Sequence, residues 1–170
     1  MTSLFPHAAY AEDQVSSHAI LYLHVTRAAA MMGSFISLIT APTSLLASRY
    51  RHKTPFTFTT LVPRLFTHSA RGIVLGSVAG VLMTYGRMRG KEEIEWQDRT
   101  WRLLENKGEV ATDWWVFDGA AAGAVVGALG VRRGRIPVGL STGVLGGAGI
   151  GSSAGVAYMI SSYARGRKPA

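Results

Sequence analysis

Residues 139–155 read GLSTGVLGGAGIGSSAG, and glycine recurs at every fourth position from Gly139 to Gly155. The stretch contains no charge and no proline, which predicts a helix, although an interior glycine destabilises a water-exposed helix by about 1 kcal/mol relative to alanine. Inside a bilayer this cost is offset when small residues at every fourth position bring two helix backbones into close contact. The stripe therefore predicts a helix that packs tightly against another helix within a membrane.

The charged residues of the chain lie in short clusters, and four long uncharged runs separate them. A helix needs about 20 mostly apolar residues to cross a hydrocarbon layer of roughly 30 Å. We therefore predict an all-α integral membrane protein with four glycine-rich transmembrane helices, at residues 27–48, 67–88, 114–131 and 136–163. These spans make up a membrane domain of residues 18–164, with an N-terminal extension of residues 1–17 and a basic tail of residues 165–170.

Small residues recur with the same spacing in all four runs, so every span is expected to present a packing face. The glycines predicted to lie at helix contacts are Gly33, Gly72, Gly76, Gly80, Gly119, Gly123, Gly127, Gly139, Gly143, Gly147, Gly151 and Gly155.

The segment between the second and third runs is the one candidate for structure outside the membrane. Glu95 and Arg99, like Asp98 and Arg102, are four residues apart, which favours a helix with paired charges. We predict a short amphipathic helix over residues 91–107 that lies on the membrane surface or on a partner protein. Tryptophans at positions 114 and 115 are typical of the interface where the chain re-enters lipid.

The net charge of +8 does not indicate a nucleic-acid partner, because the basic residues flank the apolar runs as they do at membrane borders. The loops of residues 49–71 and 132–135 are basic and contain no acid. The positive-inside rule places them on one side, the matrix side in a mitochondrion, with both termini and the loop of residues 88–112 opposite. Candidate contacts to lipid headgroups, cardiolipin among them, are Arg49, Arg51, Lys53, Arg132, Arg133 and Arg135.

Few residues suggest chemistry. The chain has no cysteine, and its five histidines lack the spacing of a metal site, so neither a metal nor a cofactor is expected. Asp118 is the one acid inside a hydrophobic run. A structural ion pair with Arg87 or Arg89 near the start of a helix is the favoured interpretation, and proton or substrate handling is the alternative. We identify no catalytic residue and expect no enzyme activity of the chain itself.

Four short glycine-striped spans with basic first and third loops resemble the mitochondrial Tim-type family of inner-membrane proteins. Translocase members of that family carry an Arg and, four residues later, an Asp shortly before a small-Gly-xxx-Gly element. Ala122, Gly123 and Gly127 match this element, but Trp115 and Ala111 occupy the two charged positions, and Asp113 is out of register. The tryptophan-rich middle segment looks more like the fungal form of an accessory subunit of respiratory complex I, which belongs to the same family.

This resemblance implies a non-catalytic accessory subunit of the NADH:ubiquinone oxidoreductase membrane arm, in the mitochondrial inner membrane. Its partners would be the other membrane subunits of that complex and membrane lipids. A subunit of an inner-membrane protein-import translocase is the alternative within the family. A transporter with Asp118 as coupling site is a third interpretation. The sequence does not show the paired charges and broken helices of that class.

Overall fold

The computed structural model describes residues 2–167 and is all-helical, with no strand among those residues. Met1 and residues 168–170, which include Lys168 of the predicted basic tail, lie outside the described residues. Two 3-10 turns, η1 (Thr2–Leu4) and η2 (Ala11–Asp13), precede five α-helices. These are α1 (Ser17–His52), α2 (Phe58–Met88), α3 (Glu93–Glu105), α4 (Lys107–Arg132) and α5 (Leu140–Ala164).

Four of the helices, α1, α2, α4 and α5, are long and apolar enough to cross a membrane. The first three begin earlier than the predicted spans, by roughly two or three turns each, because polar residues at a helix end do not stop the helix. At the start of α4, for example, the Asn106 side chain accepts hydrogen bonds from the backbone N–H groups of Gly108 and Glu109. Helix α5 begins four residues later than predicted, after Pro137 and Gly139 in the turn.

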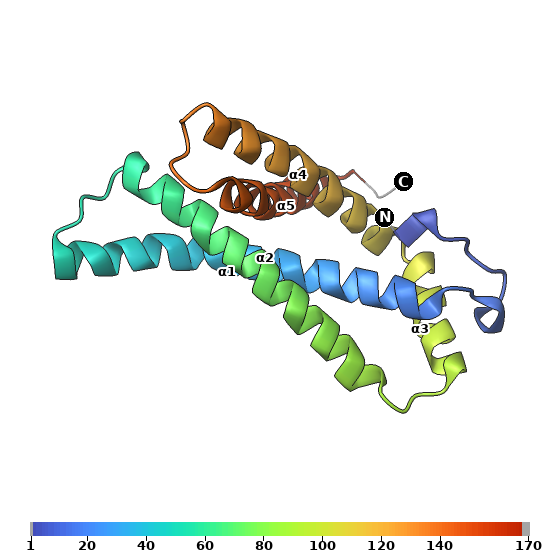
Figure 1. Cartoon of the computed structure of the whole chain (residues 1–170). Helices are drawn as coiled ribbons and strands as arrows, with labels where there is room; N and C mark the ends of the chain where they lie inside the picture. Colours follow the sequence, from blue (N-terminus) through green and yellow to red (C-terminus); the bar gives the residue numbers. More distant parts are fainter. Residues whose placement is uncertain (1, 168–170) are drawn as a thin grey trace.

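The long helices form two antiparallel hairpins, α1 with α2 and α4 with α5. The hairpins meet mainly where α2 packs on α5, while α1 and α4 barely touch. Figure 1 shows the α1–α2 and α4–α5 connections at one end of the molecule and both termini at the other, together with α3. The two basic loops therefore share an end, as the predicted topology requires.

Helix α3, observed within the predicted range of 91–107, packs on the N-terminal segment and on the start of α1. Trp96 is buried and stacks on His18, with ring centroids 3.9 Å apart. The Thr100 hydroxyl donates to the Ser17 carbonyl, and the Trp101 indole N–H donates to the Ala8 carbonyl. The N-terminal segment is thus part of an ordered cap at this end of the molecule.

Candidate functional site

The most buried charged side chain of the described chain is Asp113, in the second turn of α4, with no exposed surface. Its carboxylate lies against Arg27 of α1, whose Nε is 2.6 Å from Oδ1, and against His24, whose Nδ1 is 3.3 Å from the same oxygen. The Thr2 hydroxyl donates to Oδ2 over 2.6 Å. One carboxylate therefore joins three segments that are far apart in the sequence, and we call these four residues the Asp113 cluster.

Helical spacing explains how the cluster forms. His24 and Arg27 are three residues apart and share one face of α1, while Glu109 and Asp113 are four apart and share one face of α4. The faces oppose each other, and His24 Nε2 lies 3.9 Å from a Glu109 carboxylate oxygen. Because α1 and α4 make little other contact, this charge pairing is the main link between them.

The Asp113 cluster lies where two apolar runs begin, since Ala28 and Trp114 follow its charged members directly in the sequence. The Arg27 side chain is 10% exposed and the Asp113 side chain is not exposed at all, so water has little access to the pair. The Arg27 Nε–Asp113 contact is a close ion pair without aligned hydrogen-bond geometry, and Arg27 Nη1 is buried with no hydrogen-bond partner among residues 2–167. Such a sealed pair suits a structural clamp better than a site of proton exchange with solvent.

The predicted pairing of Asp118 with Arg87 or Arg89 is not formed. Asp118 is exposed on α4, and no ion pair within 4.0 Å in the described part of the chain includes any of the three residues. The reason is the helix pairing, because α4 packs along α5, whereas both arginines lie at the end of α2. Arg89 instead lies over the ring of Tyr85, 5.9 Å from its centroid.

The predicted packing glycines, with the exception of Gly139, lie at two helix crossings. In the α1–α2 hairpin, Gly33 faces Gly72, and the backbone at Gly76 meets that of Ala29. Gly80 packs against Thr26, whose Cα would lie 2.7 Å from a Cβ added at Gly80. At all these positions a side chain would collide with backbone atoms of the opposite helix, so glycine permits the close approach.

The α4–α5 hairpin is a regular antiparallel ladder of glycine pairs. Its three rungs are Gly119 with Gly151, Gly123 with Gly147, and Gly127 with Gly143. Gly155 continues the series against the Trp115 backbone. The prediction for Gly139 was wrong, because this residue precedes the first turn of α5 and has no atom within 4 Å of a Cβ placed on it.

A second packing face on α5 was missed. Gly146 meets the Phe66 backbone of α2, and Gly149 lies against the hydroxyl groups of Ser34 and Ser69. Ser34 and Ser69 are fully buried, as Ser152 and Ser153 nearly are, so small polar residues fill the junction of α1, α2 and α5. The signal for this second face in the sequence was the pair of additional glycines, Gly146 and Gly149, which lie outside the four-residue stripe.

The six predicted headgroup contacts, Arg49, Arg51, Lys53, Arg132, Arg133 and Arg135, are all exposed at the end that carries the two connections. Arg49 and Lys53 line a cavity of about 680 Å³ together with Tyr50 and Phe56. Arg133 and Arg135 line a smaller cavity beside Ile136. Within residues 2–167 there is no group of three or more His, Cys, Asp or Glu side chains that could hold a metal ion.

Residues 15–159 match the family described as "protein of unknown function (DUF1757)". The chain belongs to this family. The DUF1757 match begins just before α1 and ends within α5, so it includes His24, Arg27, Glu109 and Asp113 together with both glycine crossings. A search of curated proteins found no match.

Proposed function

We propose that this DUF1757 protein is a non-catalytic structural subunit of a larger membrane assembly, and that the assembly is the membrane arm of mitochondrial complex I. The observation that carries the proposal is the contrast between the side chains used inside the protein and those left on its surface. Glycines and the Asp113 cluster are used in internal contacts, while large apolar side chains project outward from α2 and α4. Leu75 and Leu82 of α2 are 68% and 62% exposed, and Val125 and Val126 of α4 are 59% and 65% exposed.

Those outward faces are the surfaces that lipid or neighbouring subunits would cover. In the proposed arrangement the protein spans the inner membrane four times, with its basic connections in the matrix and its termini and α3 toward the intermembrane space. Helix α3 would lie as an amphipathic element at the membrane surface or on a partner. The exposed arginines of the connections would contact anionic headgroups, including cardiolipin.

The resemblance to the Tim-type family supplies the choice of complex I, and a protein-import translocase is the rival assembly. The two are separated by tagging the protein at its exposed α2–α3 turn, solubilising mitochondria in mild detergent and running a native gel. We expect the protein to co-migrate with NADH dehydrogenase activity, and depletion of the protein to lower the amount of assembled complex. Co-migration with an arrested precursor instead of that activity would favour the translocase.

A variant series tests the structural, non-catalytic role. Asp113→Asn is expected to lower the amount of assembled complex while NADH oxidation per assembled complex stays the same. Asp118→Asn is the matched control, because it removes the same charge from an exposed position on the same helix. A variant that assembles fully but loses turnover would contradict the non-catalytic assignment.

A further inference from the structure

A cavity of about 470 Å³ lies between the end of α2, the start of α1 and α3. Its walls are mostly apolar and include Leu21 and Val25 of α1 with Met83 and Met88 of α2. This volume falls within the range of roughly 300–1,000 Å³ that is typical of small-molecule sites. It lies at the opposite end of the molecule from the basic connections.

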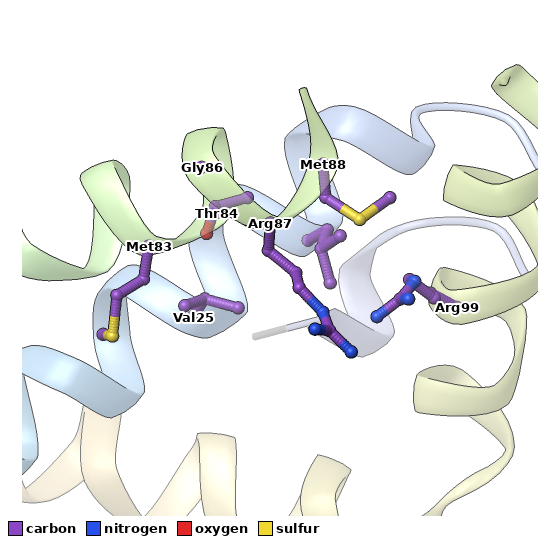
Figure 2. A pocket seen from close by; sticks show the side chains of 8 residues that line it. Val25, Met83, Thr84, Gly86, Arg87, Met88 and Arg99 are labelled. Carbon is purple, nitrogen blue, oxygen red and sulfur yellow. The ribbon is translucent and has the colours of Figure 1, made fainter. Parts of the chain in front are cut away.

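Two arginines, Arg87 of α2 and Arg99 of α3, line the same cavity. Figure 2 shows their guanidinium groups pointing toward one another across its mouth. Neither forms an ion pair within 4.0 Å to any carboxylate among residues 2–167. Two cations that line one cavity repel each other, and an anion bound between them would relieve this repulsion. A phosphate is well suited, because guanidinium donors bind its oxygens in pairs.

The position of the cavity at the border of the apolar segment fits a lipid. Arg87 directly follows the uncharged run of residues 72–86, so its guanidinium lies at the border of the apolar segment. Met83, one helical turn earlier, lies on the membrane side of Arg87 and belongs to the apolar wall. A charged mouth above an apolar wall matches a molecule with a phosphate head and a hydrocarbon chain.

We propose that this cavity binds an anionic phospholipid, with its phosphate between Arg87 and Arg99 and an acyl chain along the wall formed by Leu21, Val25 and Met83. The lipid would connect α2 to α3, two elements that are otherwise joined mainly through a short turn and their common contact with α1. The site does not depend on which assembly the protein joins. The lipid proposal can therefore be refuted while the proposed function holds, and the proposed function can be refuted while the lipid proposal holds.

The test uses the full-length protein, delipidated in mild detergent, with lipid binding measured by native mass spectrometry. Dioleoyl phosphatidylglycerol and dioleoyl phosphatidylcholine serve as probes with the same acyl chains and different net charge. The variant Arg87→Gln/Arg99→Gln removes both cations, and Arg165→Gln/Arg167→Gln is its matched control, because it removes two exposed cations that do not line the cavity.

Gly86→Leu tests the apolar part of the site. Gly86 lines the cavity within helical backbone, and a Cβ added there meets no atom within 4 Å. A leucine side chain would therefore take up the space of the acyl chain without disturbing a helix crossing. This variant also keeps both arginines, so it remains informative if the double glutamine variant fails to fold.

We expect the wild-type protein to bind phosphatidylglycerol about tenfold or more tightly than phosphatidylcholine, since each arginine near an anionic headgroup contributes roughly 1 kcal/mol. The Arg87/Arg99 variant should lose most of this preference, the Arg165/Arg167 variant should keep it, and Gly86→Leu should bind both lipids weakly. Equal binding of the two lipids by the wild type, or a preference as large in the Arg87/Arg99 variant as in the wild type, would overturn the proposal. So would glycerol 3-phosphate binding as tightly as the intact lipid, because the acyl chain would then contribute nothing.

Discussion

Two acids on α4, five residues apart, have opposite environments. Asp113 is fully buried against Arg27 and His24, whereas Asp118 is exposed and unpaired with Arg87 or Arg89. Removing charges from water is costly, so the buried pair adds little net stability compared with an apolar pair of the same size. Each partner nevertheless depends on the other, because loss of one leaves an uncompensated charge in the interior.

Asp113→Asn should therefore lower the free energy of unfolding by about 3–5 kcal/mol, since Arg27 is left buried without its counter-charge. Unfolding of the purified protein in detergent, followed by circular dichroism, measures this change. Asp118→Asn should leave the unfolding curve within about 0.5 kcal/mol of wild type. Replacing both members, as Arg27→Met with Asp113→Leu, should restore most of the lost stability. Equal effects of the two single variants would show that the Asp113 cluster is not a clamp.

A weaker, pH-dependent contact joins α3 to α1 at Glu93. Hydrogen bonds with His18 and with the Ser17 hydroxyl lower the pKa of the Glu93 carboxyl below its ordinary value. A carboxyl whose pKa is lowered by folding stabilises the folded state above its unfolded pKa, and this stabilisation is lost as the pH falls through the folded value. The contribution is small, because the Glu93 side chain is 60% exposed to solvent.

Glu93→Gln should accordingly lower the unfolding temperature slightly at pH 6–7, by much less than Asp113→Asn does. The difference between Glu93→Gln and wild type should begin to shrink as the pH falls below the ordinary glutamate pKa of about 4.3, and it should disappear once the pH is below the lowered pKa of the folded state. Thermal unfolding at several pH values, with both proteins measured in parallel, gives this difference directly. A gap that stays constant down to pH 3 would mean that the ionised carboxylate is not what stabilises the contact.

The Asp113 cluster was only partly accessible from the sequence. Asp113 was noted only as an acid out of register with the translocase motif, and the predicted span begins after it, because apolarity begins only at Trp114. Had the cap at Asn106 been used to start the helix, the spacing of Glu109 and Asp113 would have predicted a shared face. The partner on α1 depends on tertiary packing, and no local pattern encodes it.

At the scale of the helices, each hairpin is held by backbone contacts that only glycine allows. A Cβ at Gly147 would overlap the carbonyl oxygen of Gly123 and lie 3.0 Å from its carbonyl carbon. The recurrence of small residues at every fourth position predicted such contacts on α1, α2, α4 and α5. It could not predict the partner of each helix, because stripes of one spacing fit one another equally well.

Two glycine-to-alanine variants should have opposite effects. Gly147→Ala should destabilise the protein by about 1–3 kcal/mol, because the α4 backbone must move to accept the methyl group. Gly86→Ala should instead stabilise it by about 0.4–1 kcal/mol, because the helical backbone there has open space and alanine restricts the unfolded chain. Detergent unfolding of both variants tests this, and a Gly147→Ala variant that is as stable as wild type would refute the role of the ladder.

For the whole molecule, the two basic connections lie at one end, and the cap of α3 and the N-terminal segment lies at the other. The basic loops and the even number of apolar runs predicted this arrangement from the sequence. The ordered packing of the N-terminal segment was not predicted, because its contacts to α3 include hydrogen bonds to backbone carbonyls, which leave no hydrophobic pattern.

The proposed orientation can be measured cleanly, because the chain has no cysteine of its own. In mitoplasts, a membrane-impermeant maleimide should label Lys91→Cys in the α2–α3 turn. It should not label Thr54→Cys or Arg135→Cys in the two basic connections until the membrane is permeabilised. Each of the three positions lies outside the helices, and none is fully buried. The opposite labelling pattern would invert the proposed topology.

The glycine ladder of α4 and α5 does not fix its own alignment. Three glycines on α4 face a helical series of four from Gly143 to Gly155, so sliding one helix by four residues, about 6 Å, in one direction would still match glycine with glycine. The observed alignment uses the first three, and the connection of residues 133–139 is short enough to restrict such a shift. Insertions into that connection would allow a second, nearly equivalent alignment, so its length is as much a part of the fold as the glycines are.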